Sequence, residues 1–136
     1  MYNLSVKNII FDAENIDLKN NWERLSTGIA RPGLSMEYSW FKSCAEACHR
    51  FSLEAKVLEV RDQNTDKVIA LIPYKLRKEK LYRYFDVNAI YFMQLNHEYG
   101  DHYELLIAPE YYAATIDALA LWMKENKIDA SYLKNM

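Results

Sequence analysis

The longest uninterrupted apolar run in the chain is Val68-Ile69-Ala70-Leu71-Ile72. A turn-forming segment, residues 62–66, precedes this run, and a basic segment, residues 77–80, follows it. A short run of branched apolar residues between such boundaries is typical of a strand that is buried on both faces. We therefore expect the run to lie inside a sheet with helices packed against it.

Length and charge narrow the class of protein. The 136 residues suffice for one domain with a hydrophobic core, and we treat residues 1–136 as a single domain or half-domain. The net charge of −2 does not favour nucleic acid or an anionic membrane as a partner. No stretch approaches the ~18 apolar residues of a membrane span, and the N-terminus lacks the apolar core of a signal peptide. We expect a cytoplasmic protein in which Cys44 and Cys48 are reduced.

Periodicity and turn chemistry predict nine elements in the order β-α-α-β-β-β-β-α-β. Helical spacing of apolar residues predicts helices that begin near Asp17, Ser35 and Pro109. Strand-like patterns surround the central run, with a hairpin loop at 62–66, a second turn at 78–80 and a break near 86–88. The predicted strands cover residues 6–11, 53–60, 67–76, 81–95, 103–107 and 128–133. This order predicts an α+β fold (an α/β sandwich), in which a mostly antiparallel mixed sheet is flanked by about three helices.

One loop gathers residues with possible chemistry, His97-Glu98-Tyr99-Gly100-Asp101-His102. Imidazole and carboxylate groups suit zinc or iron, but the spacing matches no established metal motif. A polar loop between strands explains the same residues, and a cluster that faces a substrate is the second interpretation. We therefore assign no metal site.

The glycines argue against a nucleotide-type phosphate site. The chain contains three, at positions 28, 33 and 100, and none lies where the helix near Pro109 begins. A phosphate cradle uses several free backbone N–H groups at a helix N-terminus, and glycine lets the backbone approach closely. The sequence therefore offers no such loop.

Short motifs resemble the GNAT acyltransferases, and within them the first half of the CelD-like and Fem-type tandem proteins. These motifs are a tryptophan-leucine helix at Trp22–Leu25, the segment 35–41, an apolar-Pro-apolar step at 70–74, and Tyr99-Gly100-Asp101-His102-Tyr103 before an amphipathic helix. The resemblance covers roughly residues 22–133. It implies a GNAT-like fold and a link to acyl or acetyl transfer.

The chain departs from this pattern in two places. GNAT enzymes bind the coenzyme A pyrophosphate on a glycine-bearing loop before a helix, where this chain has Ile107-Ala108-Pro109-Glu110. The sequence also stops at Met136, where the second half of a tandem protein would begin. The resemblance therefore implies a non-catalytic N-terminal half that binds no cofactor, while acetyl-CoA or another acyl-CoA would bind to a second half.

Two main hypotheses remain open. In the first, the chain shapes an acceptor-substrate cleft beside a second GNAT domain, with substrate contacts from Tyr74, Asp101, His102 and Tyr103. Asp101 or His102 would position an amine or hydroxyl, and His102 is the candidate base. In the second, a free-standing module without transferase activity binds a protein or forms a homo-oligomer through its tyrosine-rich surface, given 11 tyrosines. A stand-alone enzyme that uses the 97–102 cluster is a third, weaker alternative.

Overall fold

The computed structural model describes residues 2–12, 14–28, 38–50, 55–81, 85–92, 106–128 and 130–133. The elements along this part of the chain are β1 (Leu4–Ile10), α1 (Ile16–Thr27), α2 (Tyr38–Arg50), β2 (Lys56–Asp62), β3 (Lys67–Leu81), β4 (Phe85–Phe92), β5 (Leu106–Ile107), the 3₁₀ helix η2 (Pro109–Tyr111), α3 (Tyr112–Glu125) and β6 (Ala130–Leu133).

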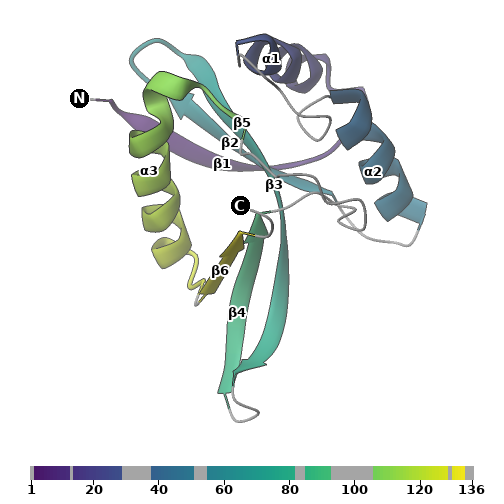
Figure 1. Ribbon diagram of the computed structural model, residues 1–136, viewed down its shortest axis with the longest axis vertical. Coiled ribbons are helices and arrows are strands. Elements are labelled where there is room, and N and C mark those ends of the chain that lie inside the picture. Colours follow the sequence, from purple (N-terminus) through teal and green to yellow (C-terminus); the bar gives the residue numbers. More distant parts are fainter. Residues whose placement is uncertain are drawn as a thin grey trace.

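The strands form one six-stranded sheet of order β1-β2-β3-β4-β6, in which β5 also pairs with β3. Every pair is antiparallel except β4 with β6, which is parallel. Figure 1 shows α1 and α2 on one side of the sheet and α3 on the other, with the far ends of β3 and β4 projecting from the body as a two-stranded arm. The predicted α+β class, with a mostly antiparallel mixed sheet and about three helices, is confirmed.

The central run is the interior of the sheet, as the sequence predicted. Val68 to Ile72 are all 3% exposed or less, because β2 and β5 flank β3 and helices cover both faces. The strand continues through Pro73 to Leu81. The turn that we predicted at 78–80 is therefore wrong, since residues 74–81 pair with β4.

Each face of the sheet has its own hydrophobic cluster. The α1/α2 face is the cluster of Leu18, Trp22, Leu25, Tyr38, Phe41, Ala45, Ala55, Val57, Val68, Leu71 and Leu106. The α3 face is the cluster of Leu58, Val60, Ile69, Ala70, Ile72, Tyr74, Ile107 and Leu119. Alternate residues of β2 divide between these clusters, as the two-residue period of a strand requires.

Local sequence accounts for where the helices begin and end. Helix α1 is capped by Asn15, whose Oδ1 accepts a hydrogen bond from the Leu18 amide at 3.1 Å. We expected Asp17 to be this cap, but it lies in the first turn, where a negative charge is favourable. Helix α3 ends at Glu125, with Asn126 as its C-cap residue. The predicted cap at Ser35 lies outside the described residues.

The predicted break near 86–88 is also wrong, because β4 runs without interruption from Phe85 to Phe92. The pairing along this side of β3 is instead interrupted after β4 ends, where the partner of β3 changes from β4 to β5. We call this place the gap in the ladder. Tyr74 of β3 pairs with Phe92 of β4, whereas Leu71 pairs with Leu106 of β5. Phe92 and Leu106, the described residues on either side of the gap in sequence, thus pair with residues of β3 that are three positions apart.

Candidate functional site

The residues beside this gap in the ladder include Tyr74, one of the four predicted substrate contacts. Tyr74 is 2% exposed, and its ring lies edge-on to Trp122 with centroids 5.9 Å apart. Its hydroxyl donates a hydrogen bond to Asn8 Oδ1 at 2.5 Å. Burial raises the pKa of Tyr74 to about 12, because the phenolate would lose its hydration. The side chain is thus part of the core on the α3 face, and a contact with substrate stays a prediction.

The other three predicted contacts, Asp101, His102 and Tyr103, lie outside the described residues, as does the rest of the 97–102 cluster. Within the described part of the chain, no group of three or more His, Cys, Asp and Glu side chains is placed to hold a metal ion. The prediction that Asp101, His102 and Tyr103 act together with Tyr74 therefore stays untested.

The turn before α3 shows how the backbone amides at this helix start are used. The amide of Ala108 donates to the Ile69 carbonyl at 2.8 Å, and that of Tyr111 donates to the Ala108 carbonyl at 2.9 Å. Pro109 has no N–H group, and the amide of Tyr112 donates to the Pro109 carbonyl. Of the four N–H groups between residues 108 and 112, three thus already have backbone acceptors, which leaves little of the donor set that a phosphate needs.

The side chains of this turn fix it to the β2–β3 hairpin. The hydroxyl of Tyr111 donates to Asp62 Oδ2 at 2.8 Å, and this bond is the main reason that the pKa of Tyr111 is raised. The other carboxylate oxygen of Asp62 accepts from the Asn64 amide, so this buried acid has both oxygens paired. The ring of Tyr2 packs on that of Tyr111 with centroids 4.4 Å apart. These contacts hold the turn before α3 against the β2–β3 hairpin.

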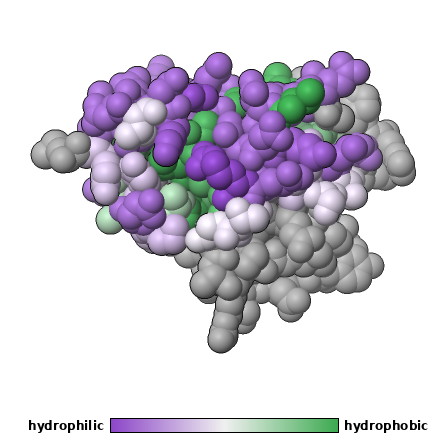
Figure 2. Space-filling model, turned by 90° about the horizontal axis from the view of Figure 1, so that it is seen from above, coloured by the Kyte–Doolittle hydropathy of each residue, from purple (hydrophilic) through white to green (hydrophobic). Residues whose placement is uncertain are grey.

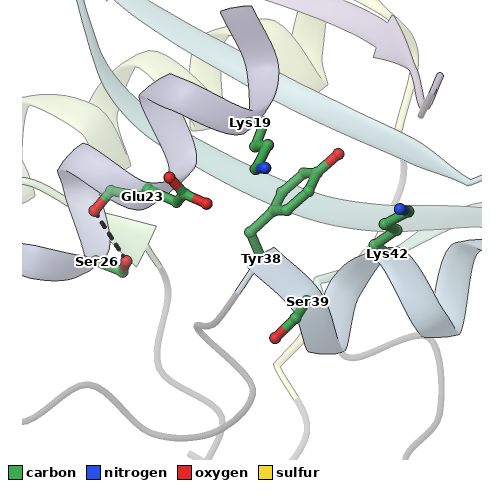
Figure 3. Close-up of a pocket in the computed structure, with 6 residues that line it drawn as sticks. All are labelled: Lys19, Glu23, Ser26, Tyr38, Ser39 and Lys42. Atoms are coloured by element: carbon green, nitrogen blue, oxygen red, sulfur yellow. Dashed lines mark hydrogen bonds between the residues drawn. The ribbon is translucent and has the colours of Figure 1, made fainter. Parts of the chain in front are cut away.

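A polar pocket of about 370 Å³ lies between α1 and α2, on the opposite face of the sheet from Tyr74. Figure 3 shows the ring of Tyr38 between the ammonium groups of Lys19 and Lys42, with the carboxylate of Glu23 on the same side of the ring as Lys19. The six lining residues are Lys19, Glu23, Ser26, Tyr38, Ser39 and Lys42. The pocket thus offers two cations, one anion and hydroxyl groups to a small polar ligand.

Tyr38 is the deepest of these residues, at 7% exposed, and its hydroxyl has no hydrogen-bond partner among the described residues. Burial, followed by the carboxylates of Glu23, Glu46 and Asp12, raises its pKa. Aromatic neighbours hold the ring in place: Trp22 meets it edge-on at 6.3 Å, and Phe11 is tilted at 6.5 Å. Sequence reasoning missed this pocket, because a lysine and a glutamate four residues apart are also typical of any solvated helix face.

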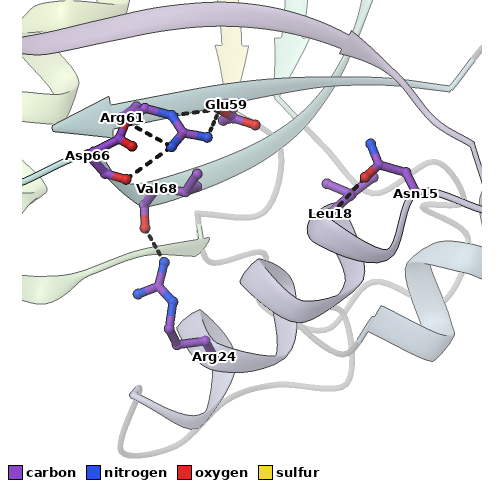
Figure 4. A network of polar contacts seen from close by, with 7 residues as sticks. All are labelled: Asn15, Leu18, Arg24, Glu59, Arg61, Asp66 and Val68. Carbon is purple, nitrogen blue, oxygen red and sulfur yellow. Dashed lines mark hydrogen bonds and ion pairs between the residues drawn. The ribbon is translucent and has the colours of Figure 1, made fainter. Parts of the chain in front are cut away.

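A second set of polar contacts joins α1 to the start of β3. Figure 4 shows Arg24 reaching the Val68 carbonyl, to which its Nη2 donates a hydrogen bond. On the adjacent hairpin, Arg61 forms ion pairs with Glu59 at 3.0 Å and with Asp66 at 3.2 Å. The hydrogen bond to Glu59 is the main reason that the pKa of Arg61 is raised. These contacts hold elements together and converge on no cavity.

Seen from above in Figure 2, hydrophilic side chains predominate, and small apolar areas lie among them. No helix among the described residues is long and apolar enough to cross a membrane.

Comparisons of the sequence with protein-family models and with curated proteins find no match. Solved structures do match. A GNAT family acetyltransferase of Staphylococcus aureus superposes with a TM-score of 0.55 at 12% identity, over 97% of this chain and 87% of that one. An aminoglycoside acetyltransferase from an uncultured soil metagenomic sample superposes with a TM-score of 0.50 at 13% identity, over 97% and 79%.

At sequence identities this low, the structural similarity supports a shared architecture and nothing about activity. The alignment spans most of an acetyltransferase chain and includes all three helices described here. The chain therefore has the GNAT acetyltransferase fold.

Proposed function

We propose that this chain is a GNAT-like domain of an acyl- or acetyltransferase that shapes the cleft for the acceptor substrate and does not itself bind acyl-CoA. It would be the non-catalytic first half of a tandem protein of the CelD-like or Fem-type kind, with residues 1–136 as that half. The observation that carries the proposal is the occupied backbone of the turn before α3.

This turn corresponds in chain order to the place where GNAT enzymes bind the pyrophosphate of coenzyme A. A doubly charged group needs several free N–H donors that converge on it. Here Ala108, Tyr111 and Tyr112 direct their amides to backbone carbonyls, and Pro109 has none. A pyrophosphate would have to break these hydrogen bonds, and the anchoring of Tyr111 to Asp62 opposes the rearrangement.

The negative charge of Glu110 also disfavours phosphate binding at this turn. Glu110 is exposed in the first turn and carries a negative charge at the end of the helix that attracts anions. Its carboxylate occupies the favourable potential and repels a phosphate that approaches the same amides. Both the engaged amides and the charge of Glu110 thus disfavour a phosphate at this turn.

The acceptor cleft is proposed at the gap in the ladder on β3. Ile72 and Pro73 lie between the residues of β3 that pair with β4 and those that pair with β5. In the sequence, Asp101, His102 and Tyr103 fall between Phe92, which pairs with Tyr74, and Leu106, which pairs with Leu71. We propose that Asp101 or His102 orients the acceptor amine or hydroxyl and that Tyr74 supports the gap from within the core.

Isothermal titration of the protein with acetyl-CoA tests the negative part of this proposal. We expect no saturable heat for the protein or for its Glu110→Gln variant, because the amides stay engaged in both. Saturable binding at micromolar concentrations, strengthened by Glu110→Gln, would show that the turn does accept the pyrophosphate and would overturn the proposal.

The alternative is a free-standing module that binds a protein or a second copy of itself, without transferase activity. The observation that favours it is the outer edge of β1, with which no strand among the described residues pairs. The coding sequence after the codon for Met136 separates the two. A further ~150–200 residues with a GNAT-like pattern, about one domain, support the tandem protein, and a stop codon there supports the module.

A further inference from the structure

Strand β1 forms one edge of the sheet, and nothing in the described part of the chain pairs with its outer side. The register with β2 is uniform from Leu4 to Ile10. At one end the Gln63 amide donates to the Asn3 carbonyl, and at the other end the Phe11 amide donates to the Ala55 carbonyl. Odd-numbered residues therefore turn their backbone groups toward β2, and even-numbered residues turn theirs toward the open edge.

Such an edge is a template for another strand unless charge, proline or a bulge protects it. Within β1 the protection is slight, because Lys7 is its only charged residue and it contains no proline or bulge. Two large apolar side chains lie exposed at its two ends, Tyr2 at 47% and Ile10 at 53%. Both are even-numbered and lie four residues from Val6.

We propose that β1 pairs with β1 of a second copy of this chain, antiparallel and centred on Val6, to give a two-fold symmetric dimer with one continuous sheet. This inference does not depend on the proposed function. A two-fold axis at Val6 places Tyr2 opposite the partner's Ile10 at both ends of the pairing. It also places Leu4 opposite the partner's Asn8.

The same register keeps the two Lys7 ammonium groups of the dimer apart. Lys7 then lies opposite Ser5 of the partner subunit, so the two ammonium groups do not face each other. A register centred on Lys7 would set them directly opposite at a Cα separation of ~4.5 Å, which is unfavourable. A register centred on Ser5 leaves Ile10 without a partner on β1.

The apolar residues continue across the junction. Val60 of β2 is opposite Val6 in the register, so the proposed axis lines up Val60, Val6 and their two symmetry mates in one row of the sheet. This row lies on the α3 face, where Val6 packs against the buried cluster. Cross-strand pairs of β-branched residues are a main source of sheet stability.

A cysteine cross-linking experiment tests both the dimer and its register. Ser5 and Lys7 of the partner form a pair without direct hydrogen bonds, with Cα atoms ~4.5 Å apart, which a disulfide can bridge. We expect a mixture of the Ser5→Cys and Lys7→Cys proteins to form the 5–7 disulfide after mild oxidation, as detected by peptide mapping. Each variant alone should form none at these positions, because like residues lie ~8 Å apart in this register.

Failure of the mixture to cross-link would overturn the proposal. A disulfide formed by Lys7→Cys alone or by Ser5→Cys alone would also overturn it, since either would place the axis at that residue. Peptide mapping distinguishes these products from any that involve the native Cys44 and Cys48.

Light scattering after gel filtration tests the association without engineered cysteines. We expect a concentration-dependent mass that approaches twice 16.1 kDa. Ile10→Lys should weaken the dimer by about tenfold, because it removes two symmetry-related apolar pairs. Ile16→Lys is the matched control and should leave the dimer unchanged, because Ile16 is also exposed, at 68%, but lies on α1 outside the interface. A monomer mass up to the solubility limit, or equal loss in both variants, would contradict the proposal.

Discussion

The two faces of the sheet treat a buried tyrosine hydroxyl in opposite ways. On the α3 face, Tyr74 donates its hydroxyl hydrogen to Asn8. On the α1/α2 face, Tyr38 is almost as deeply buried, yet its hydroxyl has no partner among the described residues. On the α3 face the hydroxyls of Tyr74 and Tyr111 are paired, and the hydroxyl left without a partner belongs to the buried Thr115. On the α1/α2 face the unpaired hydroxyl of Tyr38 lies beside a polar pocket.

The difference indicates where a ligand can be accommodated at low cost. A buried hydroxyl without a hydrogen bond costs free energy, and a ligand in the pocket between α1 and α2 that reaches Tyr38 would recover it. On the α3 face, Asn8 and Asp62 already accept the hydroxyl hydrogens of Tyr74 and Tyr111, and the unpaired hydroxyl of Thr115 is not among the groups that line this pocket.

The strongest test of the α1/α2 face is the removal of its central aromatic side chain. Trp22 is 1% exposed and stacks on Phe41 with centroids 4.5 Å apart. We expect Trp22→Ala to lower the free energy of unfolding by about 3–5 kcal/mol, as measured by urea denaturation. A loss below ~1 kcal/mol would mean that this cluster contributes little to the fold.

Alkaline unfolding separates the two faces through Tyr74. Its pKa is raised to about 12 in the folded protein, from the ordinary value of 10. The unfolded chain therefore loses this proton first, and its contribution to stability is fully present below pH 10 and is lost as the pH rises toward 12. Linkage gives a loss of about 2 kcal/mol over this range.

The variant Tyr74→Phe isolates this contribution from those of the other tyrosines. Its free energy of unfolding should fall less steeply than that of the wild type between pH 10 and 12. Parallel curves for the two proteins would refute the raised pKa.

A matched pair of tyrosine substitutions tests the comparison directly at neutral pH. Tyr74→Phe should cost about 1 kcal/mol, because Asn8 loses its hydrogen bond. Tyr38→Phe should cost nothing or stabilise the protein slightly, because it removes a buried hydroxyl without a partner. Thermal or chemical denaturation of both variants is sufficient. Equal losses would show that the Tyr38 hydroxyl does have a partner in solution.

The smallest effect is expected at the surface ion pairs of the β2–β3 hairpin. Asp66 is 87% exposed at its side chain, so its pairing with Arg61 is screened by water and salt. Asp66→Asn should change the free energy of unfolding by less than ~0.5 kcal/mol and should preserve the turn, since asparagine also tolerates the positive φ of 58° at this position. A larger change that vanishes in high salt would show a stronger pair than exposure predicts.

Sequence patterns were sufficient for the elements that depend on neighbouring residues. Apolar periodicity and turn chemistry predicted the buried run at Val68–Ile72, the hairpin loop at 62–66 and the helix that begins near Pro109. The patterns failed where pairing overrides composition. Lys78 to Lys80 are polar and read as a turn, but β4 extends beside them and holds them in a strand.

The candidate site was less accessible to sequence reasoning. Tyr74 was singled out through the resemblance, as the end of the apolar-Pro-apolar step at 70–74, and the structure places it inside the α3 face. The pocket residues Lys19, Glu23 and Lys42 carry no motif, since the pocket exists only because α1 and α2 pack against the same side of the sheet.

The sequence alone thus determined the order of the elements and the absence of a glycine loop before α3, because both depend on residue types along the chain. Tertiary structure alone decided three things: which tyrosine hydroxyls find partners, how the amides before α3 are engaged, and which strand is left at the edge. Each depends on which atoms meet across the sheet, and contacts between residues as distant as Asn8 and Tyr74 leave no local pattern in the sequence.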